Sequence, residues 1–169
     1  MVVAKGISDV SNFAVRIFLQ KMGVAHDESK GFSPYSKKNF REVKEYFNNE
    51  CCFCGNNQIK LTGDHLIPIN KTSLGLEAWG NVVPACSECN SQKHSKDWVL
   101  FLNNVAGSQS KQRQKKIEGF IAKYQYSPDV DAIRIAVEEL YEESGAIVLE
   151  LIRLKTTRAL ARSNQMAIE

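Results

Sequence analysis

Residues 51–98, CCFCGNNQIKLTGDHLIPINKTSLGLEAWGNVVPACSECNSQKHSKDW, decide how this chain is organised. Two cysteine pairs with C-x-x-C spacing bracket the stretch: Cys51, Cys54, Cys86 and Cys89. A thiolate pair separated by two residues can bind a tetrahedral metal ion from a tight turn, and two pairs complete a four-cysteine site. The spacing therefore predicts structural zinc with no open coordination position for catalysis.

The alternative interpretation of either pair is a set of buried thiols or a redox site, and the shared spacing favours zinc over both. The two pairs are separated by 31 residues, whereas a plain zinc ribbon has roughly 15–20 there. Additional structure is therefore expected between them. Cys52 could replace Cys51 as a ligand, but the spacing favours Cys51 with Cys54, and we expect Cys52 to be a small buried thiol.

The segment between the cysteine pairs has the pattern of a short hairpin followed by a helix. Residues 61–68 are branched and apolar like a strand, and residues 81–86 form a second strand pattern that Pro84 is expected to stop. A loop joins them. Ser87 is expected to cap a polar helix that runs to about residue 98. The predicted order is strand, loop, strand, helix.

This combination resembles the HNH endonuclease family, the ββα-metal nucleases. The resemblance lies in C-x-x-C-G, DHLIP, NVVPAC and C-x-x-C-N-x-x-K, in this order, and covers residues 51–98, under a third of the chain. It implies a zinc-stapled ββα-metal core. It also implies a metal-dependent nuclease that hydrolyses the phosphodiester bonds of DNA.

The same resemblance implies a role for each motif residue. His65 matches the general base that activates water, and Asp64 matches a metal ligand. Asn81 matches the central asparagine, which holds the loop and the histidine in place by hydrogen bonds. Asn90 matches the last motif position, a metal ligand on the helix. Lys93 matches a lysine that either faces phosphate or stabilises the helix.

The residue types suit phosphodiester hydrolysis, which needs a proton acceptor for water and a cation near the developing negative charge. An unperturbed imidazole titrates near ~6.5, so a neutral His65 can accept a proton. Carboxylate and amide oxygens suit Mg²⁺ or Mn²⁺ at Asp64 and Asn90. His94 lies four residues after Asn90 and would share its helical face. As a ligand it would favour Mn²⁺, Ni²⁺ or Zn²⁺, and a solvent-facing His94 is the equal alternative.

Asp64 and His65 also pose a geometric problem. Neighbours in a regular strand point to opposite faces, yet both residues must serve one phosphate. We therefore expect the hairpin to be distorted at Gly63. The alternative for this pair is an exposed turn, and the cysteine bracket favours catalysis over that alternative.

Helical extensions flank the core. Apolar spacing and end signals predict helices over 9–22, 39–48, 109–125, 128–143 and 146–162. Gly23 should end the first and Ser144-Gly145 the fourth, whereas alternation in the last also fits a strand. His26 falls in a predicted loop, where we expect a solvated imidazole. The lysine-rich helix 109–125 is expected to be a solvated face rather than a DNA contact.

The predicted fold class is α+β and mainly helical, with a zinc-stapled ββα-metal core and helical N- and C-terminal extensions. The expected boundaries are 1–49 for the N-terminal extension, 50–98 for the nuclease core and 99–169 for the C-terminal extension, together one compact unit. A chain of 169 residues suits this size.

Composition and charge bear on where the protein acts and what it can bind. A formal charge of +3 and a pI near 8.6 permit nucleic-acid binding without demonstrating it. No apolar run approaches the ~20 residues of a membrane span, and no signal-peptide pattern is present, so a cytoplasmic protein without membrane contact is expected. Double-stranded DNA is the expected partner, in restriction, phage defence or a mobile element, with a homodimer through the helical flanks. The alternatives are a non-catalytic zinc-containing module that binds nucleic acid or protein, and a nuclease subunit active only within a larger complex.

Overall fold

The computed structural model describes residues 3–166, which form a mainly helical α+β protein with one two-stranded sheet in the described part of the chain. The predicted fold class is confirmed. In chain order the elements are α1 (Val3–Ser29), η1 (Lys37–Asn39), α2 (Phe40–Tyr46), β1 (Leu61–His65), β2 (Val82–Cys86), α3 (Ser87–Lys93), α4 (Trp98–Val105), η2 (Gly107–Gln109), α5 (Ser110–Lys123) and α6 (Val130–Met166). No helix in this range is long and apolar enough to cross a membrane.

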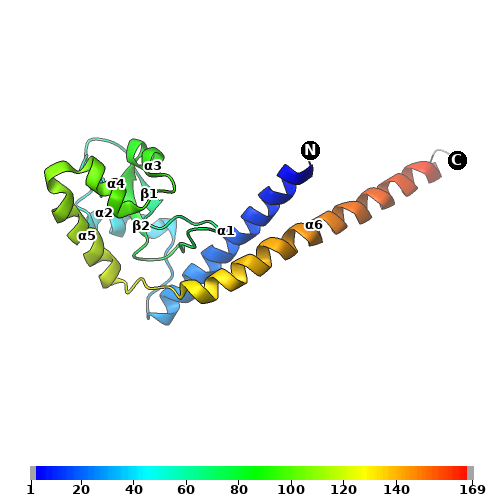
Figure 1. The fold of residues 1–169 in the computed structure, drawn as a ribbon, viewed down its shortest axis with the longest axis horizontal. Helices are drawn as coiled ribbons and strands as arrows, with labels where there is room; N and C mark the ends of the chain where they lie inside the picture. The colour runs from blue at the N-terminus through cyan, green and yellow to red at the C-terminus, as the bar shows by residue number, and fades with distance from the viewer. Residues whose placement is uncertain (1–2, 167–169) are drawn as a thin grey trace.

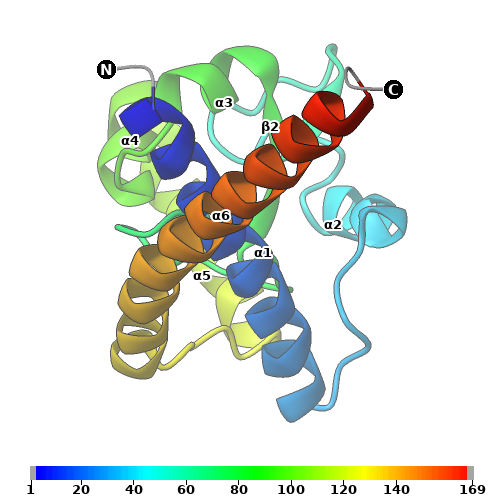
Figure 2. The same cartoon turned by 90° about the vertical axis from the view of Figure 1, so that its right-hand side faces the viewer.

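The elements form two regions (Figure 1). The hairpin and the short helices α2 to α5 make a compact core, and α1 and α6 run antiparallel to each other as a two-helix arm that extends from it. Figure 2 views the arm from its far end, with α6 crossing in front of α1. The described start of α1 therefore lies away from the core, beside the middle of α6, and the described end of α6 lies at the tip of the arm.

The hairpin is regular over its whole length. β1 and β2 pair antiparallel from Leu61 opposite Cys86 to His65 opposite Val82, and Gly63 lies directly opposite Pro84. The expected distortion at Gly63 is therefore wrong.

Pro84 does not stop β2 either, contrary to the prediction. Its carbonyl accepts a hydrogen bond from the Cys52 N–H at 2.8 Å, so its backbone polar groups face away from β1. A proline at such a position removes no hydrogen bond from the ladder.

Two hydrophobic clusters hold the regions together. The larger lies inside the core, where aromatic side chains from α2, α5 and the loop before β2 meet; Trp79 stacks on Tyr124 with ring centroids 4.7 Å apart. The smaller lies between the arm and the loop over 74–78, with Leu19 of α1 and Ile133 of α6 among its buried members. The arm is thus attached to the core by apolar packing along its inner end.

The first helix is longer than predicted. Gly23 lies within α1 instead of ending it. A side chain at this position would collide with the backbone of Glu77. Glycine serves here as a point of close packing between the helix and the loop before β2.

The continuation of α1 buries His26 and Asp27, so the solvated His26 predicted for a loop is wrong. The Asp27 carboxylate accepts backbone hydrogen bonds from Tyr35 at 2.8 Å and from Trp79 at 3.2 Å. This side chain of the arm therefore fixes two separate segments of the core.

The last two predicted helices are one continuous helix, α6, so neither the break at Gly145 nor the strand alternative holds. Gly145 is buried within the helix, and a single glycine costs a helix only about 1 kcal/mol relative to alanine. The helix is capped by Asp129, whose carboxylate accepts from the Ala132 N–H at 3.1 Å. The predictions over 39–48 and 109–125 are confirmed as α2 and α5.

Candidate metal cluster and active site

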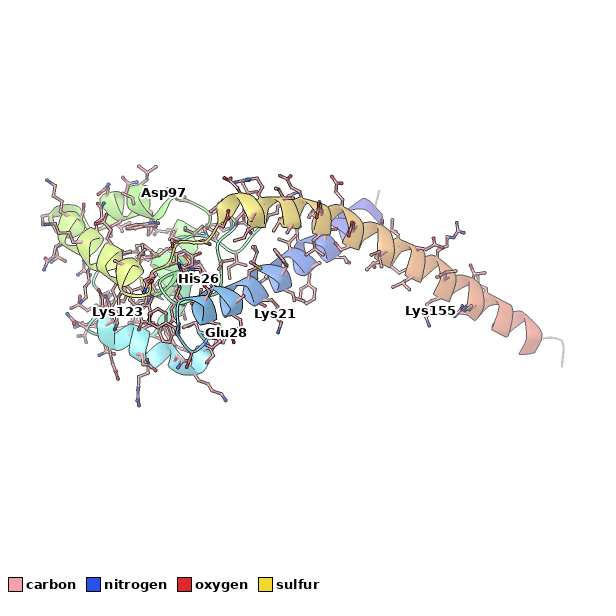
Figure 3. The ribbon with its side chains drawn as sticks, turned by 90° about the horizontal axis from the view of Figure 1, so that it is seen from below. Lys21, His26, Glu28, Asp97, Lys123 and Lys155 are labelled. Carbon is pink, nitrogen blue, oxygen red and sulfur yellow. The ribbon has the colours of Figure 1, made fainter. Side chains whose placement is uncertain are left out.

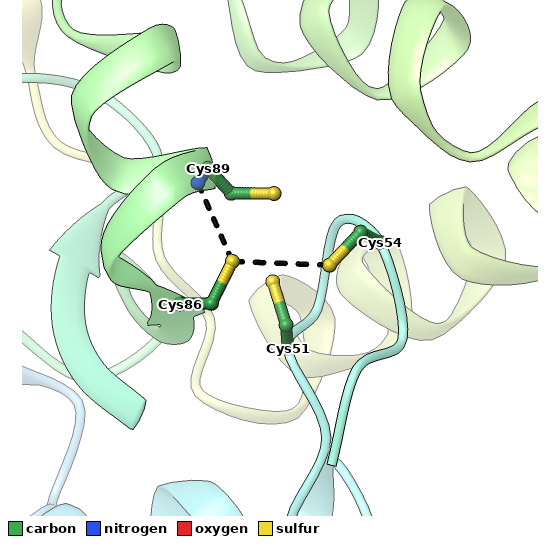
Figure 4. A group of neighbouring side chains, drawn as sticks. All are labelled: Cys51, Cys54, Cys86 and Cys89. Atoms are coloured by element: carbon green, nitrogen blue, oxygen red, sulfur yellow. Dashed lines mark hydrogen bonds between the residues drawn. The ribbon is translucent and has the colours of Figure 1, made fainter. Parts of the chain in front are cut away.

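The two cysteine pairs come together in one cluster (Figure 4). The four sulfur atoms all lie within 4.8 Å of one another, and the Cys54 and Cys86 sulfurs are 3.8 Å apart. Zinc–sulfur bonds of about 2.3 Å in a tetrahedron place sulfur atoms about 3.8 Å apart. The cluster therefore has the ligand type and spacing of a structural zinc site.

Local backbone geometry builds each half of the cluster. Gly55, at φ +80°, closes the turn after the first pair, and its N–H donates to the Cys51 carbonyl at 2.9 Å. The second pair spans the junction of β2 and α3, where the Cys86 sulfur accepts from the Cys89 N–H at 3.3 Å. The cluster thus ties the start of α3 to the loop after α2.

Arg113 of α5 supports the first cysteine loop from outside. Its guanidinium donates to the Cys51 carbonyl and forms an ion pair with Glu50, each at 3.3 Å. Sequence reasoning placed this residue only in a lysine-rich, solvated helix, because nothing in the local pattern connects residue 113 to residue 51. The fifth cysteine, Cys52, lies outside the cluster and is buried, and burial raises the pKa of its thiol well above the usual value.

Asp64 lies on the face of β1 that looks toward α3. Its Oδ1 accepts from the His65 N–H at 2.8 Å, and its Oδ2 is buried, has no hydrogen-bond partner and lies 3.5 Å from the Lys93 ammonium. Burial raises the pKa of Asp64, and the Lys93 charge opposes that rise. This oxygen is therefore ion-paired with Lys93 but accepts no hydrogen bond, which leaves it capacity to bind a further cation.

Lys93 is completely buried and acts within the fold. Its ammonium donates to the His65 carbonyl at 2.6 Å in addition to its contact with Asp64. Of the two alternatives for this residue, facing phosphate is wrong, because the side chain has no exposed surface. Lys93 instead joins α3 to the end of β1.

His65 is the last residue of β1 and lies on the opposite face from Asp64. Its Nε2 is buried without a hydrogen-bond partner. Burial, followed by the positive charges of Arg16 and Lys93, lowers its pKa to about 4. The imidazole is therefore neutral at pH 7 and has a nitrogen free to accept a proton.

His65 borders a cavity of about 280 Å³ on that face. Three consecutive strand residues, Leu61, Thr62 and Gly63, also line it, together with Tyr35 and Glu77 from the segments on either side.

Asn81 is fully buried at the entrance to β2. Its side-chain oxygen accepts from the Ile67 N–H at 2.8 Å, and its amide donates to the carbonyls of Ile67 and Leu76 at 3.0 and 2.7 Å. These contacts fix both ends of the loop that follows His65. Asn81 therefore supports this loop by hydrogen bonds, and an effect of Asn81 on catalysis remains a prediction.

Asn90 lies on α3 beside β1, and its amide is 3.4 Å from the Thr62 hydroxyl. Thr62 and Asp64 alternate on the same face of the strand, so Asn90 lies on the side of the sheet that carries the Asp64 carboxylate. The structure therefore brings Asn90 and Asp64 to one face and places His65 on the other.

His94 lies apart from this group. α3 ends at Lys93, and His94 follows it at φ 46° and ψ −113°, exposed to solvent with its Nδ1 3.1 Å from the Ser95 hydroxyl. The helix predicted to run to about residue 98 is wrong, so the shared helical face with Asn90 does not exist. The next helix, α4, begins separately after Asp97, whose carboxylate caps it.

Arg16 of α1 was not among the predicted site residues. Its charge acts on the His65 imidazole, and the residue also lines a second cavity with Asn12 and Lys71. No sequence signal connects residue 16 with residue 65, because their proximity depends on how the arm packs on the core.

The hairpin, the following helix and the four-cysteine cluster together define a ββα core with one candidate zinc site. Residues 51–96 match the family model described as HNH endonuclease. The resemblance predicted from the motifs is confirmed over this segment.

A curated relative carries the same description. The chain is 29% identical over 97 residues to "SPbeta prophage-derived putative HNH endonuclease YoqL" of Bacillus subtilis (strain 168), an alignment that covers 50% of this chain. The chain spans 40% of the length of that relative. No solved structure gives a match to the chain.

Proposed function

We propose that this protein is a metal-dependent DNA endonuclease in which His65 is the general base. The observation that most supports the proposal is a pair of unsatisfied atoms on adjacent residues. Within the described residues, only three buried side-chain polar atoms lack a hydrogen-bond partner, and two of them are Asp64 Oδ2 and His65 Nε2. Such atoms are rare in folded proteins and call for a ligand or a catalytic role.

A hard divalent cation fits the donor set on the Asp64 face. The free Oδ2 of a buried carboxylate is the kind of ligand that Mg²⁺ and Mn²⁺ prefer, and the Asn90 amide oxygen is the second proposed ligand. When bound, such an ion would supply positive charge to the scissile phosphate and the leaving oxygen. His94 is left out of the proposed ligand set because it lies outside α3, which also removes the argument for Ni²⁺.

The chain's own residues would act in distinct ways. The neutral His65 imidazole accepts a proton from the attacking water, and Lys93 fixes the two reactive residues by its contacts with the His65 carbonyl and the Asp64 carboxylate. A bound phosphate adds negative charge that offsets Arg16 and Lys93, so the pKa of His65 should rise when substrate arrives. This change would make the imidazole a stronger base in the complex than in the free protein.

The proposed substrate is double-stranded DNA, cleaved in the family manner to leave 5′-phosphate and 3′-hydroxyl ends. Cutting both strands requires two centres or two successive nicks, and a homodimer would supply two centres. A cytoplasmic role in phage defence, restriction or a mobile element is the proposed setting, and the prophage origin of the relative supports a link to phage or mobile elements.

The regular geometry of β1 favours a second candidate, a non-catalytic zinc-containing module that binds nucleic acid or protein. Asp64 and His65 lie on opposite faces of an undistorted strand, an arrangement that a purely structural hairpin would also have. A related candidate is a nuclease subunit active only in a larger complex, since the chain spans 40% of its relative.

Cleavage of supercoiled plasmid separates these candidates. Zinc-loaded wild type, His65→Ala and the matched control His94→Ala are incubated with Mg²⁺ or Mn²⁺. We expect His65→Ala to cleave about 100-fold to 10,000-fold more slowly, the usual contribution of a general base, and His94→Ala to stay within about threefold of wild type, as for most exposed positions. Equal cleavage by wild type and His65→Ala would contradict the assignment, and binding without cleavage by wild type would favour the second candidate.

A further inference from the structure

A cavity of about 460 Å³ lies between α1 and the loop that follows β1. Asn12, Phe13 and Arg16 line it from the helix, and residues 69–71 line it from the loop. Of the described residues that line the cavity, none is acidic, and two are cations, Arg16 and Lys71. The cavity therefore has the charge and the hydrogen-bond donors of an anion site.

The wall that the loop contributes is fixed by contacts within the chain. The Asn70 side-chain oxygen accepts from the N–H groups of Thr72 and Ser73 at 3.0 and 2.7 Å, which closes the turn that carries Lys71. The Lys71 ammonium lies 3.8 Å from the centroid of the Tyr141 ring on α6. A turn and a cation–π contact thus fix the position of Lys71.

Arg16 carries the charge that is most available to a ligand. Arg16 is exposed, and none of the ion pairs between described residues includes Arg16 or Lys71. On α1, Asp9 shares the face of Arg16 about 10 Å away along the axis. A different cavity beside Lys71 contains one further cation and two carboxylates: Arg134, Glu138 and Glu142. Arg16 is therefore the principal cation of the first cavity, and Lys71 is the weaker one.

The cavity lies close to His65. Its loop wall begins at Ile69, four residues after His65, and four residues span at most about 14 Å. Ile69 packs against the apolar cluster that contains Leu19 of α1, so the loop is held on this helix. After burial, the charge of Arg16 is the largest cause that lowers the pKa of His65, as expected for neighbouring groups.

We propose that this cavity binds a backbone phosphate of duplex DNA within about four base pairs of the cleaved bond, at about 3.4 Å per base pair. Arg16 is the principal contact and Lys71 the second. Both are positioning residues, since they contact the DNA away from the reacting atoms. The inference rests on the proposed endonuclease function, and it adds the arm helix α1 to the surface that binds DNA.

The chemistry of the cavity favours a phosphodiester over a free anion. A guanidinium presents parallel N–H donors that match two phosphate oxygens. Phe13 adds an aromatic side chain, 66% exposed, on the same side of α1. This apolar surface suits the deoxyribose that accompanies a DNA phosphate, whereas inorganic phosphate would leave it in contact with water.

Binding of a duplex oligonucleotide to the full, zinc-loaded chain provides the first test. Fluorescence anisotropy is measured in a His65→Ala background without Mg²⁺, so that cleavage does not contribute. Arg16→Ala should weaken binding about 10-fold, as for loss of a hydrogen bond to a charged group. It should also reduce the dependence of log K on log salt by about 0.9, the contribution of one phosphate contact.

Two further variants separate charge and geometry from an unspecific loss. Arg16→Lys should restore the salt dependence but only part of the affinity, because lysine keeps the charge and lacks the planar fork. The matched control is Lys21→Ala, an exposed cation of the same helix (Figure 3) that lies about 140° around the axis from Arg16. Its affinity and salt dependence should stay close to those of the parent protein.

Cleavage kinetics and competition by a free anion provide the second test. With supercoiled plasmid and Mg²⁺ or Mn²⁺, Arg16→Ala should raise KM about 10-fold and leave kcat within about threefold, as for a contact made equally before and in the transition state. Inorganic phosphate at constant ionic strength should leave the DNA affinity unchanged.

Three results would overturn the proposal. The first is absence of duplex binding, or an Arg16→Ala variant that matches Lys21→Ala in affinity and salt dependence. The second is displacement of DNA by inorganic phosphate from the parent protein but not from Arg16→Ala, because free phosphate would then be the occupant. The third is a change in particle mass on Arg16→Ala substitution without DNA, which would assign the cavity to a protein partner. Duplex binding that depends on Arg16 in a protein that never cuts DNA would contradict the proposed function and leave this contact in place.

Discussion

Different forces stabilise the core and the arm. In the core, a four-cysteine cluster, the buried Lys93 ammonium and the amide of Asn81 fix short segments that have little regular structure of their own. In the arm, two long helices pack through apolar side chains, and residues 151–160 of α6 are all exposed. The core should therefore depend on specific polar and metal contacts, whereas the arm should depend on apolar packing.

Removing a zinc ligand should destabilise the core more than any other substitution considered below. Structural zinc contributes on the order of 10–16 kcal/mol of folding free energy in small domains, so Cys89→Ser should lose zinc and unfold the hairpin and its neighbouring helices. The matched control is Cys52→Ser, a buried cysteine outside the cluster, which should keep one zinc per chain. Elemental analysis and near-ultraviolet circular dichroism measure both effects. A zinc-free Cys89→Ser protein with an unchanged spectrum would show that the core does not depend on the cluster.

The next largest effect is expected at Lys93. Substitution by methionine preserves the length of the side chain but leaves the Asp64 carboxylate buried without its cation, a change that costs about 3–5 kcal/mol. Urea denaturation should detect the loss in the free energy of unfolding. Lys96→Met, at an exposed position in the turn after α3, should change it by less than about 0.5 kcal/mol. If the two variants were equally stable, the contact between Lys93 and Asp64 would contribute nothing.

Asp27 tests how strongly the arm and the core are joined. Asp27→Ala removes an acceptor for the backbone N–H groups of Tyr35 and Trp79 and leaves both donors buried, so unfolding should become easier by about 2–3 kcal/mol. The neighbouring Glu28→Ala, at an exposed position (Figure 3), is the control. Hydrogen exchange should show the loss in both α1 and the segment near Trp79. A loss confined to α1 would mean that the two regions are stabilised independently.

The smallest of these effects is the response to acid through His65. The pKa of His65 is lowered to about 4 in the folded protein, against about 6.5 in an unfolded chain. The unfolded state therefore binds more protons between these values, and this contribution to stability, complete above pH 6.5, is lost as the pH falls. Between pH 7 and pH 5 wild type should lose about 2 kcal/mol more than His65→Gln.

Comparison of these two proteins by urea denaturation at both pH values isolates the histidine, because both keep the same cysteine cluster. An identical loss of stability in the two proteins would indicate that His65 is solvated in the folded protein.

The same division explains what could be predicted from the sequence. The cysteine cluster, the hairpin and the buried Asn81 follow from residues whose spacing determines their chemistry. Gly23 and Gly145 were predicted as helix ends because glycine is common there. Both lie inside helices, Gly23 at a close approach to the backbone of Glu77 and Gly145 at a buried position. Only tertiary packing distinguishes a glycine that ends a helix from one that lets a helix pack closely.

The errors in predicting the site arose partly from a missed local signal and partly from tertiary packing. Asp97 before the apolar run VLFL is a helix-capping signal that could have separated α4 from α3 and removed His94 from the shared face. Arg16 and the burial of His26 had no such local signal, because both depend on the position of the arm relative to the core. Pro84 was misjudged because a sequence does not show which edge of a strand a proline faces.

In the proposed function, one metal site supports the fold while a second, at Asp64, serves catalysis. The most direct test is plasmid cleavage by a zinc-loaded preparation titrated with Mg²⁺ or Mn²⁺, for wild type and Asp64→Asn in parallel. Wild type should remain inactive until Mg²⁺ or Mn²⁺ is added, and Asp64→Asn should retain its zinc but cleave at least about 100-fold more slowly. Full cleavage by wild type with zinc alone, or equal cleavage by both proteins, would contradict the assignment of a second, catalytic metal ion to Asp64.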